Sequence, residues 1–230
     1  MFSFQRLLVL IMAVVITVTA AAQNTRREMT VEESYLQESI EMMIIRETAR
    51  SETREQKLIA LEYINEALNR GSTNDEIRQT LEFLSREGRR IVARESGRVM
   101  NNFPDVRRQS ARFLGQLGTD EARKALIEIT QYENEPMVLM EAIKALGDIG
   151  TNENNDAVLA IAYTMRKFDS NKPDNLMALA TIETFEKIAR KNDGLKSQEA
   201  IQTLLRISDG YYVTAVRERA RQALAELRSN

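Results

Sequence analysis

Four segments in the second half of the chain share one pattern of apolar and polar positions. They cover residues 106–118, 138–150, 177–189 and 216–228, and their starts lie 32, 39 and 39 residues apart. In each segment the first residue and those eight and eleven positions further on are apolar, and such offsets fall on one face of an α-helix. The pattern therefore predicts four helices that each present one apolar stripe to a core.

Shorter amphipathic segments lie between these four and predict further helices that run in the opposite direction. They cover residues 120–131, 155–167 and 197–208. Pro104, Pro136 and Pro173 are the only prolines, and each falls just before or within the first turn of one of the four helices. A proline costs no hydrogen bond there, because the first amides of a helix have no partner inside it. This regular placement indicates a repeated unit of two antiparallel helices, and we assign residues 102–230 to a repeat array.

The region before the array is also predicted to be helical. Apolar spacing and capping residues favour helices over 31–45, 52–69, about 74–87 and 89–101. We treat 31–101 as a helical N-terminal region that caps one end of the array; the alternative is that it consists of degenerate repeats. The fold class expected is therefore all-α, an α-solenoid of antiparallel helix pairs preceded by a helical cap.

Residues 1–22 have the pattern of an export signal. Arg6 precedes an uncharged apolar run from Leu7 to Ala22 that closes on three alanines, as signal peptidase requires. The run is shorter than the ~20 residues that span a bilayer as a helix. We expect a cleaved signal peptide, a polar tether at 23–30 and a periplasmic mature protein without stable membrane insertion. The alternative is an uncleaved segment that anchors the protein to the membrane.

Composition narrows the chemistry. The chain contains neither Cys nor His, which excludes disulfides, thiolate nucleophiles, imidazole bases and zinc sites built on those side chains. There is no Trp, the net charge is −2, and no glycine-rich phosphate loop occurs. We therefore expect no catalytic site, no cofactor, no metal and no nucleic acid.

The array resembles the HEAT and HEAT-like repeat family. Phe103-Pro104-Asp105-Val106-Arg107, followed by Leu114-Gly115 and Leu117-Gly118, is similar to that family's turn and second helix, and Val216-Arg217 repeats the opening. The resemblance implies stacked helix pairs, with the four window helices lining a concave side. It also implies bonds between neighbouring repeats from Asp105, Arg107 and Arg217. Leu139 and Ala178 replace the arginine in the two middle windows.

A basic stretch, 86–112, is one candidate for function. It carries eight arginines against three acidic residues, with Arg90 and Arg94 near its centre. It could bind an anionic partner. Alternatively, it is a solvated face with some arginine pairs between repeats.

The polar face of the window helices is the second candidate, as a surface for a peptide or protein. We expect a non-enzymatic exported scaffold that binds another protein of the cell envelope through its concave face. A membrane-tethered assembly component, or a helical-repeat enzyme without His or Cys chemistry, is the alternative. The sequence leaves the oligomeric state open. The residues expected on the binding face form a mixed polar set: Arg108, Arg112, Gln116, Glu141, Lys144, Asp148, Arg219 and Gln222.

Overall fold

The computed structural model describes residues 30–169 and 173–229. The proposed signal peptide and all but the last residue of the proposed tether lie outside them. The chain divides into two compact units, Met1–Ile40 and Glu41–Asn230. Within the described residues, no helix is long and apolar enough to cross a membrane.

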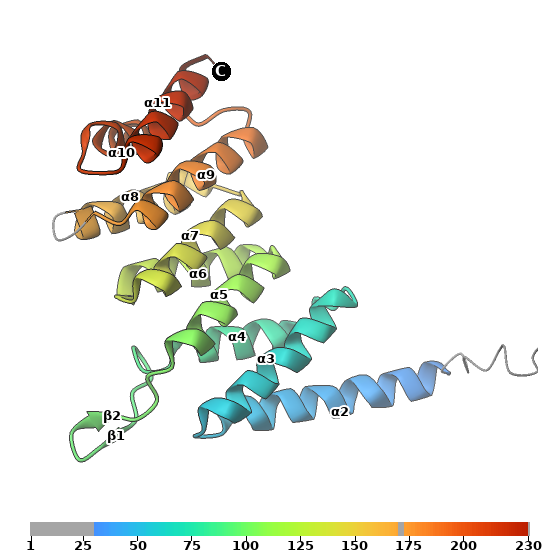
Figure 1. Ribbon diagram of the computed structural model, residues 1–230. Helices are drawn as coiled ribbons and strands as arrows, with labels where there is room; N and C mark the ends of the chain where they lie inside the picture. Colours follow the sequence, from blue (N-terminus) through green and yellow to red (C-terminus); the bar gives the residue numbers. More distant parts are fainter. Residues whose placement is uncertain (1–29, 170–172, 230) are drawn as a thin grey trace, which may run out of the picture. The chain divides into compact units, whose positions relative to one another are not determined.

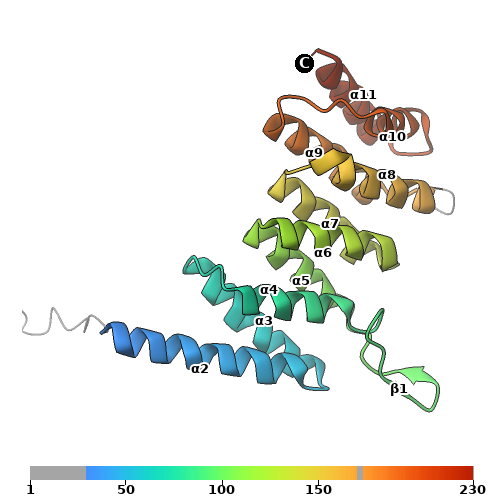
Figure 2. The ribbon, with the colours of Figure 1, turned by 180° about the vertical axis from the view of Figure 1, so that it is seen from behind.

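The described chain is almost entirely helical, as the sequence predicts, and the helices of the second unit stack in chain order (Figures 1 and 2). The helices are α2 (Val31–Arg50), α3 (Arg54–Asn69), α4 (Asp75–Arg86), α5 (Pro104–Leu117), α6 (Asp120–Tyr132), α7 (Pro136–Ile149), α8 (Asp156–Asp169), α9 (Asn175–Lys191), α10 (Gln198–Asp209) and α11 (Thr214–Ser229), with a 3₁₀ turn, η1 (Glu153–Asn155), before α8.

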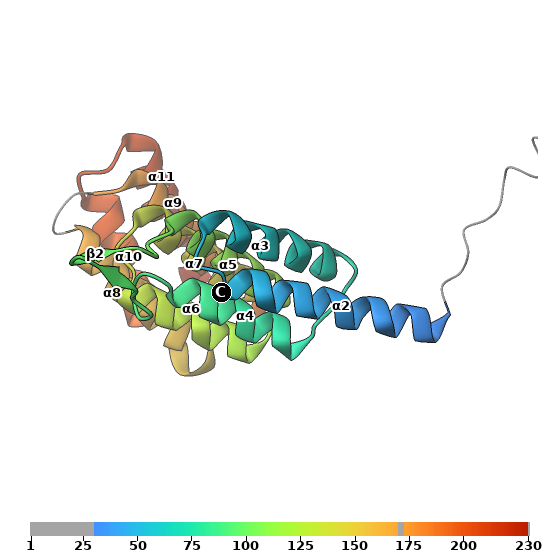
Figure 3. The ribbon, with the colours of Figure 1, turned by 90° about the horizontal axis from the view of Figure 1, so that it is seen from below.

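The second unit contains two layers of helices. One layer contains α3, α5, α7, α9 and α11, each packed on the next, and is called the B layer below. The other contains α4, α6, α8 and α10 and is called the A layer. Figure 3, which looks along the stack, shows the two rows side by side. Leu114 of α5, Leu146 of α7 and Phe185 of α9 have no exposed surface, which confirms the stripes read from the sequence.

Helix starts and ends follow the sequence signals. Pro104 and Pro136 occupy the first turns of α5 and α7. The Thr119 hydroxyl accepts a hydrogen bond from the Ala122 amide (3.2 Å) at the start of α6. Gly118 and Gly150 follow α5 and α7 in the left-handed conformation that ends many helices.

Two glycines inside the B layer set how closely its helices approach. A Cβ on Gly115 would lie 2.7 Å from the Cβ of Ala145, and one on Gly147 would lie 3.0 Å from Thr184 Oγ1. The distance at Gly115 is too short for a methyl group and that at Gly147 is tighter than most Cβ contacts, so the glycines let α5 pack closely on α7 and α7 on α9. The Leu-Gly pairs of the sequence are therefore packing features of a stacked array.

The helix expected over 89–101 is wrong, because this segment is a β-hairpin. Its strands are β1 (Arg94–Glu95) and β2 (Arg98–Val99), which pair antiparallel. Ser96 and Gly97 both have positive φ, +48° and +81°. That conformation is the type I′ turn that joins two antiparallel strands with a two-residue loop. The local turn chemistry outweighs the weak helical spacing of the apolar residues.

Candidate protein-binding surfaces

Buried ion pairs join successive units of the stack. Lys57 of α3 lies 2.9 Å from the carboxylate of Glu87, which directly follows α4. Arg107 of α5 lies 2.6 Å from the carboxylate of Glu133, which directly follows α6. All four side chains are at least 90% buried. Each pair thus ties a B-layer helix to the end of the next A-layer helix.

Glu133 is the centre of the second of these pairs. Besides Arg107, its carboxylate accepts hydrogen bonds from Arg89 (2.9 Å) and from the backbone amides of Asn134 (2.8 Å) and Glu135 (3.0 Å). Burial by itself would raise the pKa of Glu133, but Arg107 and the two amides outweigh burial and hold that pKa below its usual value. The carboxylate is therefore kept ionised inside the stack.

The bonds between repeats that the resemblance implied are present at two of three positions. Arg107 reaches Glu133, and Asp105 lies 2.5 Å from Arg54 of α3. Arg217 is the exception, because its hydrogen bond is to Thr214 (3.3 Å) of its own helix. No A-layer helix follows α11 in the described chain, so no carboxylate takes the place of Glu133 there.

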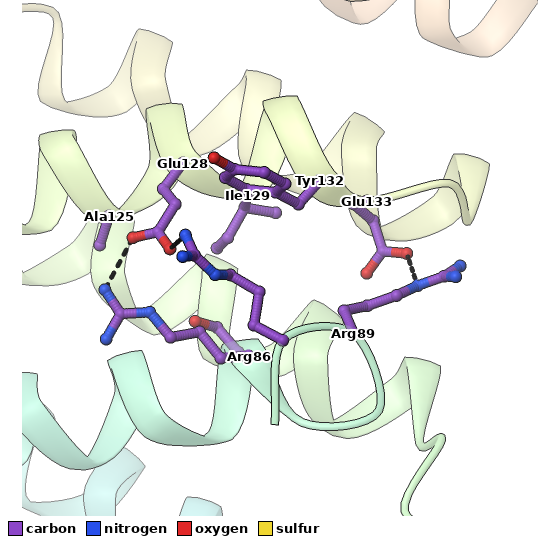
Figure 4. Close-up of a pocket in the computed structure, with 9 residues that line it drawn as sticks. Arg86, Arg89, Ala125, Glu128, Ile129, Tyr132 and Glu133 are labelled. Atoms are coloured by element: carbon purple, nitrogen blue, oxygen red, sulfur yellow. Dashed lines mark hydrogen bonds and ion pairs between the residues drawn. The ribbon is translucent and has the colours of Figure 1, made fainter. Parts of the chain in front are cut away.

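Several arginines of the basic stretch line a small pocket between α4 and α6 (Figure 4). Arg86 lies 2.7 Å from Glu128, Arg90 pairs with the same carboxylate, and the Arg90 guanidinium stands 4.5 Å from the centre of the Tyr132 ring. The hydrogen bond from Arg86 holds the pKa of Glu128 below its usual value, with partial burial working against it. The pocket has a volume of about 20 Å³, room for about one water molecule.

Four of the eight arginines in the basic stretch form ion pairs between repeats. Arg86, Arg89, Arg90 and Arg107 bind carboxylates of α6 or of the residues after it. Among the described residues, the other four arginines of the stretch have no carboxylate partner; they are Arg94, Arg98, Arg108 and Arg112. The four paired arginines therefore join repeats, and only the other four are available to bind an anionic partner.

Some of the residues expected on the binding face form ion pairs with neighbouring helices, and others do not. Asp148 is paired with Lys187 (2.6 Å), and Arg219 with Glu186 (2.5 Å), so both hold neighbouring B-layer helices together. Gln116 is exposed at the end of α5. Arg94, a candidate of the basic stretch, lies in the hairpin and donates to the Gly97 carbonyl (3.3 Å).

Three cations of the same face have no partner in the described chain. Arg108 and Arg112 lie one turn apart on α5, so about 6 Å separates their positions along the helix axis. Lys144 of α7 occupies the repeat position of Arg112, six residues after the start of its window. Because α5 packs directly on α7, axes about 8–10 Å apart bring the three cations together on one surface. We call Arg108, Arg112 and Lys144 the cation trio.

The sequence did not indicate a second surface, a groove between α6 and α8 of the A layer. It has a volume of about 610 Å³. Tyr132, Leu159 and Tyr163 line it and are 50%, 41% and 55% exposed. These residues lie off the buried stripes of their helices, and an apolar residue outside a stripe is the signal that could have located the groove.

Within the described residues, no three acidic side chains gather into a group that could hold a metal ion. The groups that these surfaces offer to a ligand are guanidinium and ammonium donors, two tyrosines and an apolar groove floor.

Comparison with known proteins bears on the fold. Residues 98–169, from the second hairpin strand to the end of α8, match the family model described as HEAT repeats. The chain contains HEAT repeats. The two-layer stack extends the same arrangement of helices to α3 on one side and α11 on the other. A search of the curated proteins finds no significant match.

Among solved structures, the HEAT-repeat chain is similar to one in the complex of CpcE and CpcF of phycocyanin lyase from Nostoc sp. PCC7120. The TM-score is 0.56 and the identity 16%, over 90% of this chain and 68% of that one. At this identity the similarity shows a shared helical-repeat fold alone. A de novo designed 16-helix transmembrane nanopore also aligns, with 20% identity over 85% of this chain and 61% of the other. Its TM-score of 0.19 is too low to indicate a shared fold.

Proposed function

We propose that this HEAT-repeat protein is a non-catalytic scaffold that is exported and binds an acidic segment of another envelope protein. The segment lies on the outer face of the B layer, which the resemblance assigned to the concave side. The observation that carries the proposal is the cation trio. Many cations between α3 and α9 are engaged in ion pairs, whereas Arg108, Arg112 and Lys144 lie on one B-layer surface without a carboxylate partner among the described residues.

The architecture supports a protein partner. Stacked repeats expose long, regular faces that suit an extended segment of another protein. The similar structure is itself of a complex, that of CpcE and CpcF. A carboxylate-bearing segment would make charge-assisted hydrogen bonds with two arginines and a lysine, and such bonds are about twice as strong as neutral ones.

Export is supported by the pattern of residues 1–22. A scaffold without catalysis is supported by the sequence, which offers neither a thiol nor an imidazole. The A-layer groove is the competing surface for the same function, since exposed tyrosines often anchor protein partners.

Photo-crosslinking in living cells tests the proposal. A photoreactive amino acid would replace Arg112 or Lys144 on the B layer, Tyr163 in the groove, or Lys196, an exposed residue just before α10. We expect one envelope protein to be captured from the two B-layer positions and not from Lys196. Capture from Tyr163 alone would move the binding site to the groove, and capture from none of the four would contradict the scaffold proposal.

A further inference from the structure

The hairpin is an insertion with a rigid base and an exposed tip. It belongs to residues 87–103, which join α4 to α5, whereas three residues join α6 to α7. Asn101 is 93% buried and bonds to Ala93 N (2.9 Å) and Ile91 O (2.8 Å), and Arg107 donates to the Glu87 carbonyl (3.2 Å). A Cβ on Gly88 would meet the Asn101 carbonyl at 2.6 Å. These contacts fix the base without using the tip.

The hairpin exposes apolar side chains, from its base to its second strand, together with two arginines of its strands. Val92, Val99 and Met100 are 39%, 36% and 51% exposed. Arg94 and Arg98 are exposed and have no carboxylate partner among the described residues. The stack does not need these side chains, because α6 and α7 are joined without such an insertion. A short, anchored hairpin with exposed apolar and basic side chains is suited to docking against an apolar surface that carries carboxylates.

The first ten residues of α2 form such a surface. Every residue from Val31 to Ile40 is exposed. At 100° per residue, Val31, Tyr35, Leu36 and Ile40 fall in one half of the helix circumference, and Glu32 and Ser39 fall in the same half. These four apolar side chains are 87%, 75%, 61% and 46% exposed, so this half of the helix presents uncovered apolar side chains around the carboxylate of Glu32.

The charge of this helical segment is the opposite of the hairpin's. Residues 31–40 carry three glutamates and no cation; Glu33 and Glu38 flank the half with the apolar side chains, and Glu32 lies within it. Residues 89–100 carry four arginines and one glutamate, but Arg89 and Arg90 are already paired with Glu133 and Glu128. The helical segment thus carries −3, whereas Arg94 and Arg98 less Glu95 leave +1 on the hairpin for a partner. Both segments combine charges of opposite sign with exposed apolar side chains.

We propose that the protein self-associates, with residues 31–40 of one copy docked on the hairpin of a second copy. Apolar side chains of the helix cover Val92, Val99 and Met100, and its glutamates pair with Arg94 and Arg98. A two-fold dimer forms this contact twice, because each copy offers both segments. A membrane is the poorer occupant for residues 31–40, since three glutamates without a cation are repelled by anionic lipid.

Sedimentation equilibrium on the protein purified after expression of the full chain tests this association. We expect a dimer that dissociates at ~10 μM and weakens at high salt, in the range of small interfaces with exposed ion pairs. Arg94→Glu with Arg98→Glu should weaken the dimer at least about tenfold, and so should Glu32→Arg with Glu38→Arg. The four changes together should restore it. Glu33 is left unchanged because it caps the helix through Thr30.

Lys124→Glu with Lys196→Glu is the matched control, since both lysines are exposed outside the two segments, and its dimer should match that of the unaltered protein. Circular dichroism confirms that each variant folds. A monomer at all concentrations, or no restoration by the four combined changes, overturns the proposal. Monomers that sediment with phosphatidylglycerol vesicles through Arg94 and Arg98 would assign the hairpin to the membrane and overturn it as well. The assay needs no other protein, so its outcome is independent of the proposed scaffold function.

Discussion

Replacing Glu133 by alanine should destabilise the stack strongly, because it leaves a buried cation without its counter-charge. Arg107 has no exposed surface, and Glu133 is its only carboxylate partner in the described chain. The remaining partners of Arg107 are the Glu87 carbonyl and Asn102 Oδ1, at 3.2 and 2.9 Å. Neutral acceptors satisfy its N–H groups but do not compensate its charge.

The magnitude follows from burial. Removing one partner of a buried ion pair costs about 3–5 kcal/mol. For a chain of this size, 1 kcal/mol lowers Tm by about 2–4 °C, so we expect Glu133→Ala to lower Tm by about 10 °C. Each single change leaves one buried charge without its partner, whereas Arg107→Met with Glu133→Leu removes both charges. The double variant should therefore be less destabilised than either single variant.

Glu128→Ala is a closely matched control. Glu128 lies on α6, which ends just before Glu133, and also binds two arginines, but these pairs are partly exposed, with a quarter of the Glu128 side chain open to solvent. Such pairs contribute about 1 kcal/mol or less. Urea denaturation of both variants, followed by circular dichroism, measures the difference. Equal losses from the two substitutions would refute the reasoning that burial sets the cost.

Further predictions concern acid, the core, the hairpin base and a helix cap. The pKa of Glu133 is lowered on folding, so its contribution to stability is complete above about pH 4.5 and is lost as pH falls through the folded-state pKa. Glu133→Gln should flatten the acid side of a stability profile measured by urea midpoints. Leu146→Asp should unfold the array at 37 °C, because it buries a charge in the stripe; native-like circular dichroism would contradict the assigned register. Asn101→Ala should speed hydrogen exchange in residues 91–100 while the helices keep their protection; unchanged exchange would mean that Asn101 does not anchor the hairpin. Thr119→Ala should lower the free energy of unfolding, measured by urea denaturation, by about 1 kcal/mol; an unchanged free energy would mean that Thr119 does not stabilise the start of α6.

The repeat architecture was predictable because it depends on local sequence patterns. Stripes at helical spacing, prolines at helix starts and glycines at helix ends agree with one another, and the structure follows them closely at Pro104, Gly118, Pro136 and Gly150. Each signal reports the conformation of residues near it in sequence, so one sequence suffices to read it.

The segment 89–101 was misread because its apolar residues fit two periods. Ile91, Val92, Val99 and Met100 allow a helix, and only the Ser96-Gly97 turn decides for a hairpin. Short apolar runs are ambiguous in this way, and one turn with positive φ outweighs them.

The candidate site was predictable only in part, because pairing across repeats depends on distance in space. The sequence does not indicate that Asp148 reaches Lys187 or that Arg90 reaches Glu128, whereas Arg108 and Arg112 have no carboxylate partner in the part of the chain that the structure describes. These outcomes depend on the register between helices that lie 30 to 40 residues apart. The A-layer groove was missed for the same reason, since its two walls come from different repeats.

The most direct test of the account compares what the protein binds in the envelope before and after the cation trio is reversed. Arg108→Glu, Arg112→Glu and Lys144→Glu would be combined, and a control would reverse three exposed cations elsewhere, Arg50, Lys124 and Lys196. Both variants and the unaltered protein would be crosslinked in the native envelope, purified and analysed by quantitative mass spectrometry. The account predicts one envelope protein that is enriched with the unaltered protein and the control and lost from the trio variant. Equal recovery with all three forms, or no enriched protein with any, would contradict it.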